Sequence, residues 1–335
     1  MNSETLSPNI KERSTLLLSN SLDPVEAEKI IKEVYEYFSE VTTITGFDME
    51  VKHLAAVPTA RGMALSLNYA AQCLLDYRRT AKFIQGIVAA IQEKQRNHPG
   101  QVIRILYAGC GPYAPFVTFI APLFRPEEIQ FSLLEINEES LESAKKLIEA
   151  LDQRGYINEY YLADAVTFEI PSPNSFQILI SETLDAVLYR ECYVPILFNL
   201  LPQLSEQITV IPENVHLNLS FLVDCDNDNE VREEDHHCFK ERIVDVRRAV
   251  ACYNPHSDNL PSTLPTEQFK LEPKARYKGM IIDTDVHIYD ELWLHRGESS
   301  LTVACEIAMQ SSAEYNNVSF TYHLEPQVEL KFEFQ

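Results

Sequence analysis

Residues 103–111 read Ile-Arg-Ile-Leu-Tyr-Ala-Gly-Cys-Gly, and this stretch predicts a buried strand that runs into a tight turn. The chain has only nine glycines, so the pair at Gly109 and Gly111 indicates a local backbone requirement. A turn of this kind lets the backbone approach a nucleotide closely. The G-x-G pattern alone is weak evidence, because most of its matches are ordinary structural turns.

Strands and helices alternate through residues 101–212. Five strands are predicted, at 102–108, 130–136, 158–163, 176–181 and 208–211. Helices are predicted between them, at 113–123, at 138–153 after the capping residue Asn137, and at 189–201. The alternation predicts an α/β fold with a Rossmann-like, doubly wound and mostly parallel sheet.

The region before the sheet, residues 1–100, is predicted to be helical. Residues 1–22 are polar and are expected to fray. A first helix is predicted from Pro24, behind the capping residue Asp23, to about residue 40. A second helical stretch covers about 64–95 and is ended by a His-Pro-Gly sequence.

Residues 213–335 have a different rhythm. Apolar and polar residues alternate with a period of two at 215–222, 279–289, 300–307, 317–323 and 328–334. This alternation predicts half-exposed antiparallel strands and a second, β-barrel-like domain. An insert at about 225–275 interrupts it, with an acidic stretch from Asp226 to Asp235 and a predicted helix at 238–251.

Composition excludes several classes of protein. The net charge of −22 argues against a nucleic-acid partner, because phosphate binding needs clustered Lys and Arg. An acidic surface favours cationic substrates, although solubility alone also accounts for it. The chain lacks an apolar run long enough to span a membrane and has a polar start. The seven cysteines form no C-x-x-C pair, which argues against a structural metal site or disulfide framework and predicts a cytoplasmic protein.

Several residues are predicted to meet where the strands end. Ligands of open α/β sheets lie outside the carboxyl ends of the strands, which is where the Gly109-Cys110-Gly111 turn falls. Glu135 ends the second strand, where a carboxylate can bind two ribose hydroxyls, and Asp164 with Ala165 follows the third strand, next to an adenine. The alternative is that both acids only cap strand ends. Pro112 replaces the third glycine of a dinucleotide fingerprint, which favours a smaller adenosine ligand over NAD.

Two glutamates follow the fourth strand. Glu182 and Glu191 lie nine residues apart and resemble a clamp for a cation. They could be mere surface acids, but Leu184, Val187 and Leu188 make the loop between them unusually apolar.

Residues 103–182 resemble a class I S-adenosylmethionine-dependent methyltransferase, and flanking residues narrow the resemblance to the protein arginine methyltransferases. The stretch from Ser181 to Glu191 is similar to that family's double-glutamate loop. Residues 74–80 resemble its Leu-x-Asp-x-x-Arg-Thr pattern, and Ile211-Pro212-Glu213 resembles its junction into a β-barrel. The resemblance covers about 70–225 well and the remainder only in architecture.

The resemblance implies S-adenosylmethionine as cofactor and a role for each matching residue. Arg79 would bind the cofactor's methionine carboxylate. The other cofactor contacts would come from Gly109, Cys110, Gly111, Glu135, Asp164, Ala165 and Glu182. Glu182 and Glu191 would hold a substrate guanidinium, and Asp76 would join them as a catalytic residue. The insert would be a dimerisation arm, which implies a homodimer.

This sequence also departs from the family pattern. Tyr107 replaces the acid of the first motif, and the barrel's Thr-His-Trp sequence is missing; Leu292-Trp293-Leu294-His295 lies nearest but does not match. A lone His295 is more often a packed or solvent-facing residue than a partner of Asp76. The missing motif favours free arginine or a small guanidino compound over an arginine-rich protein as acceptor. A methyltransferase for other small molecules and a non-catalytic adenosyl-binding protein are the remaining alternatives.

Overall fold

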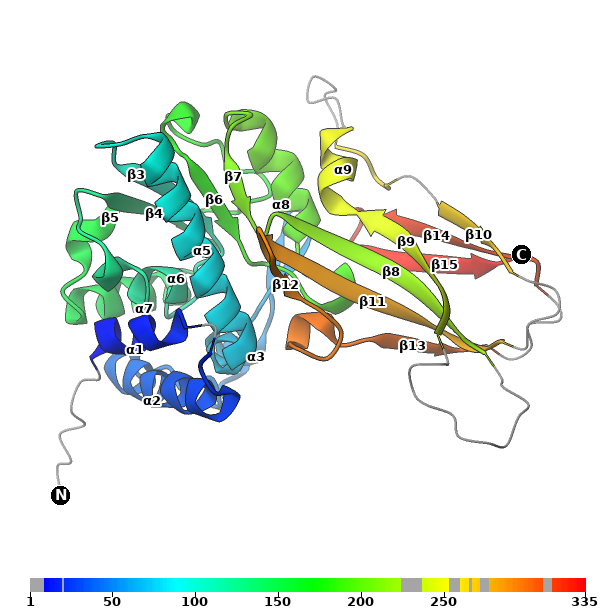
Figure 1. Ribbon diagram of the computed structural model, residues 1–335, viewed down its shortest axis with the longest axis horizontal. Helices are drawn as coiled ribbons and strands as arrows, with labels where there is room; N and C mark the ends of the chain where they lie inside the picture. Colours follow the sequence, from blue (N-terminus) through cyan, green and yellow to red (C-terminus); the bar gives the residue numbers. More distant parts are fainter. Residues whose placement is uncertain are drawn as a thin grey trace.

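The computed structural model describes residues 9–19, 21–223, 237–252, 260–264, 267–271, 277–309 and 315–335. It has two regions, a parallel sheet surrounded by helices and a region of antiparallel sheets (Figure 1). The acidic stretch Asp226–Asp235 of the expected insert lies outside the described residues. Within the described ranges, no helix has both the length and the apolar character needed to cross a membrane.

The parallel sheet forms from the five segments that were predicted to be strands. Its strands are β3 (Ile103–Ala108), β4 (Ile129–Glu135), β5 (Ile157–Leu162), β6 (Ile178–Ser181) and β7 (Thr209–Ile211). They are all parallel, in the order β5-β4-β3-β6-β7. The chain therefore winds outward from β3 in both directions, and right-handed crossovers place helices on opposite faces. The Rossmann-like, doubly wound sheet is confirmed, and its switch point lies between β3 and β6.

Three helices follow strands of this sheet. They are α6 (Pro115–Thr118), α7 (Glu138–Ala150) and α8 (Tyr193–Leu200). Asn137 caps α7 as predicted, because its side chain accepts a hydrogen bond from the Ser140 N–H. The single helix predicted at 113–123 is wrong: α6 stops early, and a separate 3₁₀ turn, η2 (Ala121–Leu123), holds Pro122, which lacks an N–H for a continuous helix.

The N-terminal helices agree in part with the prediction. Helix α2 (Pro24–Thr42) begins behind Asp23 as expected. Residues 1–22 were expected to fray, but α1 (Ile10–Leu17) forms there because it buries Ile10 and Leu17 in the core. The long helix expected at 64–95 is broken into α4 (Leu67–Gln72), the turn η1 (Cys73–Leu75) and α5 (Tyr77–Asn97). The break falls at Asp76, whose side chain caps α5.

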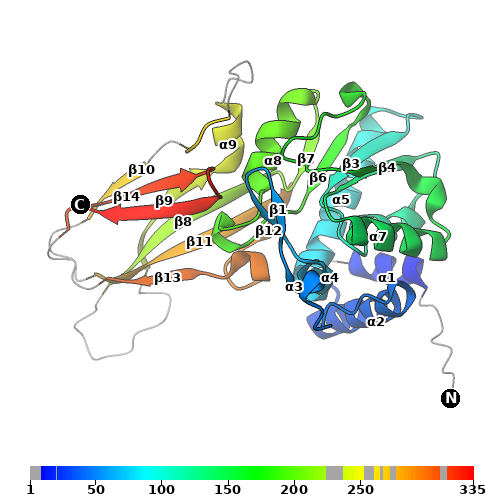
Figure 2. The ribbon, with the colours of Figure 1, turned by 180° about the vertical axis from the view of Figure 1, so that it is seen from behind.

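A short hairpin precedes α4 and was not predicted. It follows α3 (Val51–Leu54) and consists of β1 (Val57–Thr59) and β2 (Gly62–Ala64), paired antiparallel. Figure 2 shows β1 at the junction of the parallel and antiparallel regions. The hairpin therefore lies close to the edge of the parallel sheet where ligands are expected.

The second region is antiparallel, as predicted. One sheet has the order β12-β11-β8-β9 with β13 also paired to β11; its strands are β8 (Asn214–Val223), β9 (His237–Asp245), β11 (Tyr277–Tyr289), β12 (Leu292–Leu294) and β13 (Cys305–Ala308). The other contains β10 (Glu267–Lys270), β14 (Asn317–His323) and β15 (Glu329–Phe334). The helix predicted at 238–251 is wrong: β9 pairs with β8 there, and only α9 (Val246–Ala251) is helical. Pairing with a long neighbouring strand overrides the local helical pattern.

Candidate active site

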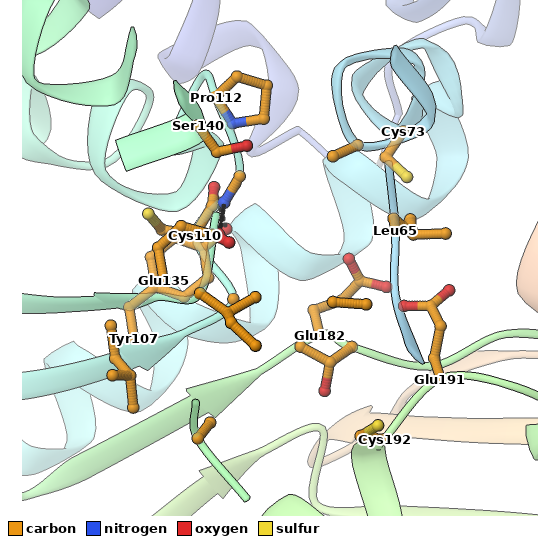
Figure 3. Close-up of a pocket in the computed structure, with 18 of the residues that line it drawn as sticks. Leu65, Cys73, Tyr107, Cys110, Pro112, Glu135, Ser140, Glu182, Glu191 and Cys192 are labelled. Atoms are coloured by element: carbon orange, nitrogen blue, oxygen red, sulfur yellow. Dashed lines mark hydrogen bonds between the residues drawn. The ribbon is translucent and has the colours of Figure 1, made fainter. Parts of the chain in front are cut away.

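A pocket of about 1010 Å³, including its open mouth, lies at the carboxyl ends of the parallel strands. Its walls come from the turn after β3, the ends of β4 and β5, the β1–β2 hairpin, helices α4 and α5, and the segment after β6 (Figure 3). The predicted residues that line it are Arg79, Gly109, Cys110, Gly111, Glu135, Asp164, Ala165, Glu182 and Glu191. The fold therefore gathers residues that are up to 112 positions apart, from Arg79 to Glu191, around one space.

The glycine turn has the backbone requirement that its sequence indicated. Gly109 and Gly111 have φ angles of +73° and +64°, in the left-handed region that favours glycine. A Cβ on Gly109 would overlap with Thr183 Cγ2, so Thr183 would have to move to make room for a side chain. The turn thus needs glycine for its conformation and, at Gly109, for its close contact with the segment after β6.

Glu135 lies at the end of β4 and is buried. Its Oε2 accepts a hydrogen bond from the Gly111 N–H at 2.8 Å, and its Oε1 accepts one from the Asn137 N–H at 2.9 Å. Burial raises the pKa of this carboxyl, and the backbone hydrogen bonds act in the opposite direction. A carboxylate oxygen has a second lone pair, so Glu135 can still accept the hydroxyls of a ribose. The end of the pocket beside Glu135 therefore keeps acceptor capacity that a ligand with paired hydroxyls could use.

Asp164 joins the sheet to the hairpin. Its Oδ2 accepts a hydrogen bond from the Ala60 N–H at 2.7 Å, and its Oδ1 accepts one from the Val166 N–H at 2.9 Å. This is the capping role that was the alternative for Asp164. The adenine contact of Asp164 and Ala165 stays a prediction.

Arg79 and Glu182 form an ion pair through Nη2 and Oε2, with side chains only 9% and 7% exposed. Within the described part of the chain, the other carboxyl oxygen, Glu182 Oε1, is buried without a hydrogen-bond partner. Burial raises the pKa of Glu182 to about 7, although Arg79 acts to lower it. An unsatisfied buried acceptor is costly, and beside a ligand pocket it indicates a donor that belongs to the ligand.

Glu191 completes an acidic pair with Glu182. Figure 3 shows the two carboxyl groups turned toward one another. Burial, and then the neighbouring Asp185 and Glu182, raise the pKa of Glu191 to about 8. Two carboxyls in one partly dry space repel each other when both are ionised, and a cation between them removes the repulsion.

The β1–β2 hairpin supplies the part of the site that the sequence did not reveal. Met63 pairs with Glu191 in an isolated parallel bridge, and the Thr59 hydroxyl lies 2.9 Å from Cys192 Sγ. Arg61 forms an ion pair with Glu325 at 2.7 Å. The Ala60-Arg61-Gly62 sequence is a turn signal, but nothing local indicates that this turn reaches the glutamates.

Asp76 and His295 do not line the pocket or meet each other. Asp76 Oδ2 accepts hydrogen bonds from Ser299 Oγ at 2.7 Å and from the Ser300 N–H at 2.8 Å, while Oδ1 caps α5 through the Arg79 N–H. His295 Nδ1 instead lies 3.1 Å from Asp285 Oδ1. Asp76 therefore fixes the start of the helix that carries Arg79, and its catalytic role stays a prediction.

Tyr107 occupies the position where an acid was expected from the resemblance. It lines the pocket, and its hydroxyl donates a long hydrogen bond of 3.5 Å to the Cys110 carbonyl. Burial raises its pKa, so it remains a neutral phenol.

Across the described ranges, no three His, Cys, Asp or Glu side chains gather in a way that could hold a metal ion.

Comparisons with known proteins do not establish a family for this chain. No protein-family model matches the chain, and no curated protein matches it. A solved structure, the Trypanosoma brucei PRMT1 enzyme-prozyme heterotetrameric complex with AdoHcy, is similar over 79% of this chain and 92% of that chain, with 10% sequence identity and a TM-score of 0.48. A likeness at this level is evidence of neither fold nor function.

Proposed function

We propose that this protein is an S-adenosylmethionine-dependent N-methyltransferase that acts on a guanidino nitrogen, and that its acceptor is free L-arginine or a small guanidino compound. The observation that carries the proposal is the buried Oε1 of Glu182, which has no hydrogen-bond partner among the residues that the structure describes and belongs to a carboxyl group that faces Glu191. A guanidinium offers planar N–H donors and a positive charge, the two properties that this pair of carboxyls needs.

The acidic pair can both bind and activate a guanidinium. A guanidinium stays protonated near neutral pH and is a poor nucleophile. Glu182 and Glu191 would hold one side of it, concentrate the positive charge there and leave the opposite nitrogen richer in electron density. Their raised pKa values mean that binding of the cation also ionises them, because each carboxyl must lose its proton to form the pair. The chain then contributes chiefly orientation and electrostatic stabilisation.

The other end of the pocket has residues suited to the cofactor. Glu135 would accept the ribose hydroxyls, and the turn at 109–111 would lie against the adenosine. Arg79 would bind the amino-acid carboxylate with a guanidinium fork that now faces Glu182. A bound S-adenosylmethionine would supply the methyl group from its sulfonium. Under this proposal Arg79 would lie between the two ligand sites, paired with Glu182 on the acceptor side.

The β1–β2 hairpin favours a small acceptor. Backbone pairing of Met63 with Glu191 places it beside the acidic pair, and the Ala60 hydrogen bond to Asp164 holds its turn. The Arg61 ion pair with Glu325 ties the same turn to the antiparallel region. A hairpin held from both regions is fixed beside Glu191, and we infer that it would limit the room for a polypeptide there.

Mass spectrometry of the acceptor tests the proposal. The protein is incubated with S-adenosylmethionine and, in parallel, with free L-arginine, agmatine-like guanidines, arginine-rich peptides and simple amines. We expect added methyl mass on free arginine or a small guanidine. Methylation of peptides alone would make the acceptor a protein. Methylation of amines alone, or cofactor binding without any transfer, would contradict the guanidine assignment.

The assembly and location of the protein also stay proposals. We propose a homodimer, as the resemblance implies, and sedimentation of the purified chain tests it. The expected arm at about 225–275 includes β9, α9 and β10 among the described residues. The cysteines at 73, 110, 192, 252 and 305 are free thiols, in keeping with the proposed reducing cytoplasm.

A further inference from the structure

The loop between the two glutamates contains a strained turn. Val187 and Leu188 have φ angles of +63° and +54°, in the left-handed region. Few non-glycine residues adopt this region, and for a β-branched residue such as Val187 it is a steric outlier. Backbone of this kind persists only where the surroundings hold it, and such sites cluster at active sites.

Two hydrogen bonds from the antiparallel region hold this turn. The Val187 N–H donates to Thr284 Oγ1 at 2.8 Å, and the Tyr322 hydroxyl donates to the Leu188 carbonyl oxygen at 2.7 Å. Thr284 lies on β11 and Tyr322 on β14, so the two contacts come from different sheets. Their side chains are buried, with exposures of 0% and 1%. Each contact therefore comes from a rigid strand and not from a mobile surface group.

The turn determines where Glu191 lies. The two residues after the turn, Tyr189 and Arg190, donate their N–H groups to Oδ1 of Asp185, at 2.8 and 3.2 Å. These hydrogen bonds fold the chain back toward the pocket. The Arg190 carbonyl then accepts the Met63 N–H at 3.4 Å, and Glu191 follows directly. Glu182 is fixed independently, since it follows β6 and pairs with Arg79. The separation of the two carboxyls thus depends on the conformation of residues 187 and 188.

We propose that Thr284 and Tyr322 are positioning residues of the methyl-transfer site: they hold the Val187–Leu188 turn so that Glu191 faces Glu182 across the space for the acceptor. This inference rests on the proposed function, because it assigns the acidic pair to a guanidinium. It makes the antiparallel region part of the catalytic apparatus. Neither residue touches the acceptor, so both act through the loop.

Two nearly isosteric substitutions test the inference. Thr284→Val and Tyr322→Phe each remove one hydrogen bond to the turn, while Thr284→Ser keeps the hydroxyl and is the matched control. We expect kcat for guanidine methylation to fall about tenfold in each of the first two variants, the size of effect expected for one lost buried hydrogen bond. Affinity for the cofactor product, measured by calorimetry, is expected to stay unchanged. Thr284→Ser is expected to keep kcat close to wild type.

A second measurement separates positioning from general damage. Val187→Gly removes the steric cost of the left-handed turn, so Tyr322→Phe is expected to cause a smaller loss of kcat in that background than in wild type. In the single variants, the acid limb of the pH–rate profile is expected to move to lower pH as Glu191 leaves its buried surroundings. Hydrogen exchange of residues 183–190 is expected to become faster.

Each outcome bears on either the positioning role of Thr284 and Tyr322 or the proposed function. If wild type methylates a guanidine and both variants keep full kcat, the inference is overturned and the proposed function stands. Loss of cofactor affinity together with kcat would mean general structural damage and would also overturn the inference. A wild-type protein that methylates no guanidine overturns the proposed function, and the positioning role with it.

Discussion

The carboxyl groups at the two ends of the pocket differ in how completely the chain supplies their hydrogen-bond partners. At the cofactor end, both oxygens of Glu135 accept backbone N–H groups from the chain itself. At the acceptor end, Glu182 Oε1 has no partner among the described residues, and the pKa values of Glu182 and Glu191 rise to about 7 and 8. The first arrangement is complete without a ligand, whereas the second is electrostatically incomplete. The difference indicates which end needs a cation.

Buried carboxyl groups that stabilise a fold differ from those that serve a function. A buried carboxyl that is fully hydrogen-bonded can serve the fold alone, as a strand cap does. A buried pair of carboxyls with an unsatisfied oxygen instead lowers the stability of the fold, because hydrogen bonds and the Arg79 ion pair offset only part of the cost of desolvation. Perturbed groups of the second kind cluster at functional sites.

The largest effect is expected from neutralising the acceptor end. Glu182→Gln or Glu191→Gln removes one of the charges that grip the guanidinium, so methyl transfer is expected to fall by about 10³-fold, the loss typical of a preorganised charge. Transfer is measured by mass spectrometry with saturating cofactor. Glu149→Gln, an exposed acid on α7, is the matched control and should be neutral. Near-wild-type turnover in Glu182→Gln would favour a methyltransferase that does not use the pair.

At the proposed cofactor end, binding is expected to be weakened by steric crowding and not by the loss of a charge. Gly109→Ala adds a Cβ that overlaps with Thr183 Cγ2 at a positive φ, so affinity for the cofactor product is expected to fall by about tenfold to a hundredfold. Gly111→Ala is the control, because Gly111 lies in the same turn with a φ of +64°, and an added Cβ there would meet only Ala70 Cβ, at 4.0 Å. Calorimetry on both variants separates crowding from backbone strain. Equal losses in the two would show that the close contact at Gly109 is unimportant.

Binding of a guanidine is expected to depend on pH more than binding of the cofactor. The acidic pair must be ionised to hold a cation, and its pKa values of about 7 and 8 lie above the ordinary value for Glu. Affinity for a small guanidine should therefore tighten as pH rises from 6 to 9, by up to about tenfold per unit for each protonated carboxyl. Calorimetry in buffers of different ionisation enthalpy should detect released protons. Affinity that is flat over this range would contradict the raised pKa values.

The smallest effect is expected on the free energy of unfolding of Glu191→Gln. This variant should gain stability although it loses activity. The pKa of Glu191 is about 8 in the fold and near 4.5 in the unfolded chain, so wild-type stability is lost as pH rises through this window. Glu191→Gln removes that loss and is expected to raise the free energy of unfolding at pH 9 by about 1 kcal/mol, discounted for partial exposure. Urea unfolding at pH 5 and pH 9 measures it. A gain at pH 5 as large as at pH 9 would rule out ionisation as the cause.

The parallel sheet could be predicted because its signals are local. Strands β3, β4, β6 and β7 are short and mostly apolar, β5 is rich in tyrosine, and Asn137 and Asp23 mark helix starts within a few residues of the chain. Non-local contacts decide the parts that were missed. Strand β9 forms because β8 pairs with it, and α1 forms because the core buries one of its faces.

The candidate site could be predicted to the extent that strand ends converge. Glu135 ends β4 and Glu182 follows β6, and these two strands flank β3 in the parallel sheet, so the topology alone brings both residues to one edge. The hairpin could not be placed, because its partners Asp164, Cys192 and Glu325 are more than 100 positions away along the chain. The strained turn at Val187 was equally hidden, since an apolar loop sequence does not indicate a positive φ.

The Tyr322 contact to the glutamate loop spans 134 residues of chain, and this has a consequence for synthesis. During translation, the parallel sheet and both glutamates emerge well before β14 is made. A nascent chain at that stage can form the cofactor end of the pocket while its acceptor end still lacks the strand that fixes the loop. The segments that carry Gly109, Gly111 and Glu135 are therefore made first, and the Leu188 carbonyl oxygen gains its Tyr322 partner only when β14 has been synthesised.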